Sequence, residues 1–149
     1  MNYATKGIET SESSVLNVLT ELRKGQIREA VDAFADKFKF TDYGIGLEFD
    51  DKERLAEFFQ KTLELYPDSV LVTDRILANG QNVTTEWTLR CTVTERFFGG
   101  LSRRVPVVTH GVSVVRMGNG KITRWSEYYD GLTARRTALG SYFTDWVEL

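Results

Sequence analysis

Apolar residues in the first half of the chain recur at the spacing of an amphipathic helix. Val15, Val18 and Leu19 begin one such stripe, and two similar stripes follow it. A period near 3.6 residues indicates helices that bury one side. The pattern predicts three helices, over residues 11–24, 26–34 and 51–65. Asp50, followed by Glu53 three residues later, resembles a capping box at the start of the third helix.

The hydrophobic period changes from 3.6 to 2 after residue 68. Alternation of this kind predicts strands over residues 69–78, 83–97, 105–117 and 121–130, and an extra short strand is expected at 38–43. Glycine-rich turns separate the long strands, as in an antiparallel meander. We therefore expect one α+β domain over residues 1–149, with the helices packed on one face of a curved antiparallel sheet.

The strand alternation also predicts which side chains face the helices. Hairpins closed symmetrically near Gly99-Gly100 and about Asn119 would place Gly111 opposite both Leu89 and Glu127, and Ser113 opposite Trp87 and Trp125. The expected inner face consists of Trp87, Leu89, Cys91, Thr109, Gly111, Ser113, Trp125, Glu127 and Tyr129. Small residues on the middle strand would leave a hollow above Gly111, with Glu127 beside it. This hollow is the predicted pocket.

Composition and charge exclude several classes of function. The net charge of −2 gives no basic footprint for nucleic acid. A single cysteine, Cys91, and a single histidine, His110, leave no support for a disulfide, a His- or Cys-based metal site or a Ser-His-Asp triad. No apolar run is long enough to cross a membrane, and the first residues do not resemble a signal peptide. We expect a cytoplasmic protein without a cofactor or metal.

Several segments resemble the nuclear transport factor 2-like superfamily, nearest to its SnoaL-like, ketosteroid isomerase and limonene epoxide hydrolase branches. They are the three-helix start, Phe34-Ala35-Asp36 leading into Phe40-Thr41-Asp42, and the stretch GKITRWSEYYD over residues 120–130. The resemblance covers nearly the whole chain. It implies a cone-shaped fold with a pocket at its wide end, and it implies that dimers are common.

The same resemblance suggests roles for individual residues. Asp42 is similar in position to the carboxylate base of ketosteroid isomerase, whereas the donor acid of that enzyme has no match, the nearest inner position being Ser113. Glu127 matches a catalytic aspartate of limonene epoxide hydrolase. The arginine and second aspartate that this hydrolase also needs fall at Trp87 and Leu89 here, so its catalytic set is not intact.

Each candidate residue also has an ordinary structural interpretation. Glu127 is either a carboxylate in an apolar pocket or a solvated strand residue, and Asp42 is either a base at a cleft or the cap of a turn. Trp87, Trp125 and Tyr129 line a ligand site or fill the core. A further group of candidate ligand contacts consists of Leu89, Gly111 and Ser113. The aromatic tail, residues 141–149, closes the pocket or packs on a partner chain.

The sequence favours a small-molecule enzyme that uses acid and base chemistry on an apolar substrate. Isomerisation, dehydration, cyclisation and hydrolysis all fit, with Glu127 and Asp42 as the acid and the base. The alternative is a non-catalytic module of the same fold that binds a ligand or a protein. Val108, Val112 and Val114 beside His110 on the outer face of the sheet predict a homodimer.

Overall fold

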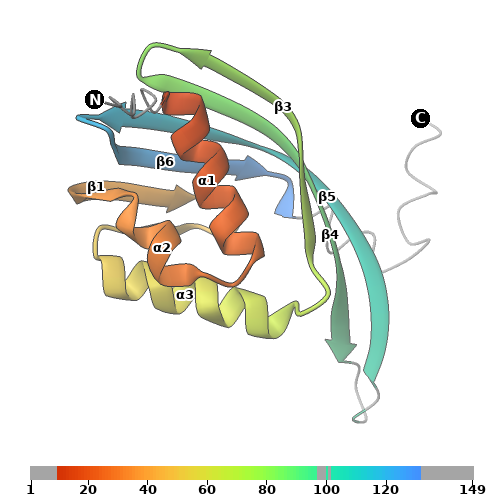
Figure 1. Cartoon of the computed structure of the whole chain (residues 1–149). Helices are drawn as coiled ribbons and strands as arrows, with labels where there is room; N and C mark the ends of the chain where they lie inside the picture. Colours follow the sequence, from red (N-terminus) through yellow and green to blue (C-terminus); the bar gives the residue numbers. More distant parts are fainter. Residues whose placement is uncertain (1–9, 97–99, 101, 132–149) are drawn as a thin grey trace, which may run out of the picture.

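The computed structural model describes residues 10–96, 100 and 102–131, and it has the expected α+β architecture. Three helices gather on one face of a curved sheet (Figure 1). The helices are α1 (Ser11–Arg23), α2 (Ile27–Asp32) and α3 (Lys52–Leu65). The strands are β1 (Phe34–Asp42), β2 (Leu47–Phe49), β3 (Val70–Asn79), β4 (Asn82–Arg96), β5 (Ser102–Gly118) and β6 (Lys121–Tyr129). The sheet order is β2-β1-β6-β5-β4-β3.

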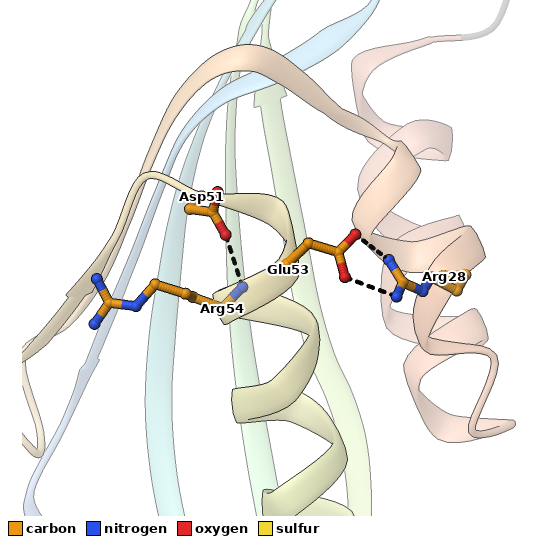
Figure 2. Close-up of polar contacts among 4 residues, drawn as sticks. All are labelled: Arg28, Asp51, Glu53 and Arg54. Atoms are coloured by element: carbon orange, nitrogen blue, oxygen red, sulfur yellow. Dashed lines mark hydrogen bonds and ion pairs between the residues drawn. The ribbon is translucent and has the colours of Figure 1, made fainter.

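Helix α3 begins one residue later than the sequence suggests. Its N-cap is Asp51, whose side chain accepts a hydrogen bond of 2.9 Å from the backbone N–H of Arg54 (Figure 2). The predicted capping box from Asp50 is therefore wrong. Two adjacent aspartates made the position ambiguous, because either can satisfy a free N–H group at a helix start.

An ion pair between exposed side chains connects α2 to α3. The two terminal nitrogens of the Arg28 guanidinium donate to the carboxylate of Glu53, as Figure 2 shows. This charge-assisted contact lowers the pKa of Glu53. Both side chains are largely exposed to solvent, so the ion pair contributes to the orientation of the short α2 more than to overall stability.

Strand β1 is longer than predicted and changes the sheet. Helix α2 ends at Asp32, and Phe34, predicted as its last residue, instead begins β1 and pairs with Ile122. Strand β1 runs parallel to β6, so the sheet is antiparallel except for this one pair. A register shift between Phe34 and Lys39 spoils the alternation there, which explains why the sequence did not reveal the whole strand.

The apolar core lies between the helices and one end of the sheet. From the helices it contains Val15, Val18, Leu19, Ile27, Ala30, Val31, Leu55 and Ala56, and from the sheet it contains Phe34, Phe38, Phe40, Val83, Val115, Met117, Ile122 and Trp125. The predicted helical stripe of Val15, Val18 and Leu19 and the predicted inward position of Trp125 are part of this core. Farther along β4 and β5, Val105 and Val107 are buried in a smaller cluster with Cys91 and Val93.

The predicted inner face is retained, but both hairpin pairings are displaced by two residues. Gly111 pairs with Trp87 and Tyr129, and Ser113 pairs with Thr85 and Glu127. In the β5–β6 hairpin the displacement has two causes. The turn has only two residues, with positive φ at Asn119 and Gly120, and a bulge follows between Arg116 and Met117. A displacement of two preserves the face of every side chain.

Candidate functional site

A row of polar residues crosses four strands on the inner face of the sheet. Thr85 on β4 pairs with Ser113 on β5, Ser113 pairs with Glu127 on β6, and Glu127 pairs with Asp42 on β1. Two residues along each strand toward the core, the neighbouring row on the same face is apolar and consists of Val83, Val115, Trp125 and Phe40. Two residues along in the other direction, the neighbouring row contains Trp87, Gly111 and Tyr129, with two aromatic rings. The polar row is therefore enclosed by apolar surface on both sides.

Three side-chain donors surround the carboxylate of Glu127. The Oε1 atom accepts a hydrogen bond of 2.5 Å from Nε1 of Trp125. The Oε2 atom accepts from the hydroxyl of Ser113 at 2.7 Å and from Nε1 of Trp87 at 3.2 Å. Indole N–H groups can only donate, so both tryptophans fix Glu127 as an acceptor on each of its oxygens.

These surroundings hold Glu127 near the point of protonation at neutral pH. Burial disfavours the charged carboxylate and raises the pKa from 4.5 to about 7. The hydrogen bonds from Ser113, Trp125 and Trp87 oppose this rise, while the negative charge of Asp42 adds to it. Glu127 itself is only partly buried, so some of its surface remains reachable.

Asp42 lies beside Glu127 and has one of the two roles that the sequence left open, the cap of a turn, while its role as a base stays a prediction. Its Oδ1 atom accepts a hydrogen bond of 3.1 Å from the backbone N–H of Ile45 and so caps the turn after β1. Its Oδ2 atom accepts from the hydroxyl of Tyr129 at 3.2 Å. The side chain is buried, and burial raises the pKa of Asp42 although the hydrogen bond from Tyr129 opposes the rise.

Tyr129 completes the group of titratable side chains around Asp42 and Glu127. Its ring lies against Gly44, where an added Cβ would come within 2.2 Å of the phenol ring. Burial first, and then the charge of Asp42, raise the pKa of Tyr129 above its usual 10, so the phenol remains a hydrogen-bond donor at neutral pH. Gly44 therefore serves the site by allowing the ring to approach the chain closely.

The predicted hollow above Gly111 is filled by the indole of Trp87. A Cβ added at Gly111 would lie 2.3 Å from that ring, so glycine is what lets the indole cross the strand. The indole also donates to Ser113 at 2.9 Å and lies 5.7 Å from the ring of Tyr129, measured between centroids. The expectation of an open space at this position is wrong, because Gly111 faces Trp87 and not the smaller Leu89.

The remaining predicted site residues are divided between the site and its surroundings. Trp125 is a core residue whose indole donates one hydrogen bond to Glu127, and its role in a ligand site stays a prediction. Leu89 pairs with Thr109, one row beyond the aromatic rings, and so lies outside the polar row. Cys91 is partly buried, and burial raises the pKa of its thiol.

Thr85 is the site residue that sequence reasoning missed. The register predicted from the sequence sets Ser113 opposite Trp87, so it does not bring Thr85 to the site. The structure makes it fully buried, pairs it with Ser113 and leaves its Oγ1 without a hydrogen-bond partner. A polar residue between Val83 and Trp87 in an otherwise apolar alternation was the signal that could have identified it.

Two surface hollows lie away from this polar row. The larger, of about 570 Å³, lies between α2 and α3 and is lined by residues that include Ile27, Arg28 and Glu53. The smaller, of about 330 Å³, includes Phe38 and Thr123. Neither includes a residue of the polar row, so a ligand pocket beside Glu127 stays a prediction, and it cannot occupy the space over Gly111 that Trp87 fills.

The outer face of the sheet carries a polar chain centred on Thr88. The Thr88 hydroxyl donates to Asp74 at 2.6 Å, and its oxygen lies 2.9 Å from Nδ1 of His110. Because the hydroxyl proton is directed to Asp74, this nitrogen of His110 is the donor. His110 pairs with Thr88 and is exposed on the outer face, the face on which the sequence predicts it.

Within residues 10–96, 100 and 102–131, no three His, Cys, Asp or Glu side chains come together as a metal site. The helices of this part of the chain are all too short or too polar to cross a lipid bilayer. The predicted aromatic tail, residues 141–149, lies outside the described residues.

Three helices packed on a curved six-stranded sheet make up a fold of the nuclear transport factor 2-like type. A family model described as SnoaL-like polyketide cyclase matches residues 13–137. The chain therefore belongs to the SnoaL-like polyketide cyclase family. No curated protein matches it significantly in sequence.

Solved structures of distant sequence share this fold. IdmH, a candidate polyketide cyclase from Streptomyces antibioticus, is 18% identical with a TM-score of 0.74, and the match covers 86% of this chain and 97% of IdmH. An epoxide hydrolase of M. tuberculosis resembling limonene epoxide hydrolase is 22% identical with a TM-score of 0.64, over 87% of this chain and 84% of that one. A protein of Catenulispora acidiphila with a ketosteroid isomerase-like fold, solved with trimethylamine, is 16% identical with a TM-score of 0.70, over 84% and 91%. At sequence identities this low, the structural similarity shows a shared fold and not a shared activity.

Proposed function

We propose that this protein is an enzyme that moves a proton on a small apolar substrate, with Glu127 as the acid or base. The observation that carries the proposal is the carboxyl of Glu127, held by Trp87, Trp125 and Ser113 and kept near its midpoint of ionisation at neutral pH. General acid–base catalysis is most efficient when the pKa of the group lies near the working pH.

In this proposal Glu127 and its neighbour Asp42 have complementary roles as acid and base. Neutral Glu127 donates its proton to a substrate oxygen, and ionised Glu127 removes a proton from carbon. Asp42, whose oxygen accepts from the Tyr129 hydroxyl, is the second carboxylate and holds the opposite protonation state. Isomerisation, dehydration and cyclisation need these two functions and no cofactor. Hydrolysis of an epoxide by the known three-residue set is not proposed, because Trp87 and Leu89 cannot replace its arginine and aspartate.

The substrate is an apolar molecule that binds beside the aromatic row of Trp87, Gly111 and Tyr129. Trp87 and Tyr129 offer ring faces, and Glu127 and Ser113 offer the polar groups at the edge of that surface. The family to which the chain belongs acts on small molecules, which supports this choice of substrate class. A cytoplasmic location is the setting that we expect for such an enzyme.

Proton exchange between the solvent and a test substrate checks this proposal, and it does not require that the natural substrate be known. A panel of apolar ketones and epoxides is incubated with the protein in deuterated water, and deuterium at carbon or ring opening is followed by NMR. We expect turnover with the native chain and loss of at least about 100-fold in Glu127→Gln, as is typical when a general acid or base is removed. Equal turnover by both proteins would contradict it.

The position of Trp87 favours a second candidate, a binding module without catalysis. Its indole fills the space over Gly111, and the two surface hollows lie elsewhere. Such a module would bind an apolar ligand or a protein while Glu127 serves only to order the two tryptophans. Ligand binding that is unchanged in Glu127→Gln, with no turnover on the panel, would favour this candidate.

The outer face of the sheet supports a homodimer. Val108, Val114 and Tyr128 are each at least 40% exposed there, and the ring of Tyr43 stacks on Tyr128 with centroids 4.7 Å apart. An exposed apolar area on a sheet face is usually covered by a partner. Sedimentation at micromolar concentration should give a dimer that Val108→Lys with Val114→Lys dissociates. Leu65→Lys, a change at an exposed apolar residue at the end of α3, is the control that should remain dimeric.

A further inference from the structure

The hydroxyl of Ser113 serves two neighbours when Glu127 is ionised. It donates its single proton to Oε2 of Glu127 at 2.7 Å, and its oxygen accepts from Nε1 of Trp87 at 2.9 Å. A hydroxyl has one proton and two acceptor positions. In this state one acceptor position of Ser113 remains open, and its only donor proton is committed to Glu127.

Protonation of Glu127 reverses the contact with Ser113. Oε1 accepts a short hydrogen bond from the Trp125 indole, whereas the Trp87 indole lies farther from Oε2, at 3.2 Å, than from Ser113, at 2.9 Å, and can donate to Ser113 alone. The new proton therefore belongs on Oε2 and is directed at the Ser113 oxygen. That oxygen then accepts from both Glu127 and Trp87, which uses both of its acceptor positions. The hydroxyl proton of Ser113 has to leave Glu127 and find another acceptor.

Thr85 carries an acceptor at the right place. It pairs directly with Ser113 across β4 and β5, on the same face of the sheet, and it is fully buried. Its Oγ1 has no hydrogen-bond partner when Ser113 donates to Glu127. Directly opposite residues have Cβ atoms about 4.5–5.5 Å apart, so rotation of the Thr85 side chain can bring its Oγ1 within reach of the Ser113 hydroxyl. A buried hydroxyl without a partner is costly and calls for an explanation.

We propose that Thr85 is a positioning residue that lets Glu127 hold its proton. When Glu127 takes up a proton on Oε2, the Ser113 hydroxyl turns from Glu127 and donates to Oγ1 of Thr85. The Thr85 side chain rotates and the Ser113 O–H changes direction, and the proton gained by Glu127 comes from substrate or water. The partnerless Thr85 hydroxyl of the ionised state is thus the acceptor reserved for the neutral state. The inference rests on the proposed function, in which Glu127 alternates between these states.

The other groups that titrate near Glu127 do not replace Thr85. Asp42 on β1 and Tyr129 on β6 contact each other, and Tyr66, after α3, acts electrostatically on Tyr129. Of these, the charge of Asp42 raises the pKa of Glu127, and the charge of Glu127 raises the pKa of Tyr129. Trp87 and Trp125 are donors in both states. Thr85 is the paired neighbour of Ser113 with an unused acceptor.

The test is a titration of Glu127 in the free protein, followed by the carboxyl-carbon NMR signal that Glu127→Gln removes. Thr85→Val keeps the shape and removes the acceptor, so it withdraws a hydrogen bond from the neutral state alone. We expect the pKa of Glu127 to fall by about half a unit to one unit, as one hydrogen bond is lost. Thr85→Ser should restore the native value. At a pH above the Glu127 midpoint, where the Thr85 hydroxyl has no partner, Thr85→Val should not lower thermal stability.

A second background shows whether Thr85 acts through Ser113. In a Ser113→Ala protein, Thr85→Val should leave the pKa of Glu127 unchanged, since the connecting hydroxyl is gone. An equal fall in both backgrounds, or no fall with Ser113 present, would overturn the inference. The titration needs no substrate, so it is independent of the proposed function. Turnover retained by Glu127→Gln would overturn that function while a shifted titration in Thr85→Val upheld the inference.

Discussion

Asp42 and Glu127 are paired residues on the parallel strands β1 and β6, so two carboxyl side chains lie next to each other on the inner face. Burial raises the pKa of Asp42, and the negative charge of Asp42 adds to the rise in the pKa of Glu127. Under the proposed function, these neighbouring carboxyl groups are the acid and the base.

Asp42→Asn should lower the pKa of Glu127 below its value of about 7, because the neighbouring negative charge is removed. The amide oxygen of asparagine can still cap the backbone N–H of Ile45, so the turn after β1 should persist. The carboxyl signal of Glu127 in an NMR titration measures the change. Asp36→Asn, at a fully exposed position on the same strand, is the control and should leave the midpoint where it is.

The elevated pKa of Glu127 makes stability depend on pH. The unfolded chain ionises at about 4.5 and the folded one at about 7, so the folded state binds its proton more tightly. Stability from this group is full below pH 4.5 and decreases as the pH rises to about 7, by about 3 kcal/mol at about 1.4 kcal/mol per pH unit. Above that pH the contribution stays constant.

Glu127→Gln removes this titration while preserving a neutral side chain of the same shape. Its free energy of unfolding, measured by urea at several pH values, should rise relative to the native chain between pH 4.5 and 7. An identical pH dependence of the two proteins would show that Glu127 ionises normally.

Gly111→Ala should destabilise the fold by about 1–3 kcal/mol, because the added methyl group would overlap the indole of Trp87. Urea unfolding measures the loss. In a Trp87→Leu background the same change should cost clearly less, since the smaller side chain vacates the space. Equal costs in both backgrounds would mean that the indole does not lie over Gly111.

Asp51→Ala should destabilise the protein by about 1 kcal/mol, since the backbone N–H of Arg54 loses its cap. Asp50→Ala is the matched control, one residue earlier and equally exposed, and it should leave the melting temperature nearly unchanged. A larger effect at Asp50 would restore the cap that the sequence pattern first suggested.

Strong periodicity made most of the fold predictable. The helical stripes from Val15 and Leu55 and the alternation along Val83 and Thr85 gave the correct elements within a few residues. The segment from Phe34 to Phe40 was harder, because a register shift within β1 breaks its alternation and a short helix precedes it. Parallel pairing of β1 with β6 leaves no local sign in either strand.

The face of each site residue could be predicted, but its neighbours could not. Alternation placed Glu127 on the inner face correctly, whereas the partner opposite it depends on the turn at Asn119 and the bulge after Arg116. The register shifts caused by the turn and by the bulge add together. As a result Ser113, and not the predicted Gly111, lies opposite Glu127. The hydroxyl pair of Thr85 and Ser113 became visible only with this correct register.

Whether Glu127 exchanges a proton near neutral pH is tested most directly by an NMR titration of its carboxyl carbon in the native protein. The signal is identified as the one that Glu127→Gln removes. We predict a midpoint near pH 7, well above the 4.5 of an ordinary glutamate, because burial between two tryptophans disfavours the charged form. A midpoint at or below 4.5 would contradict the assignment of Glu127 as the acid or base of this site.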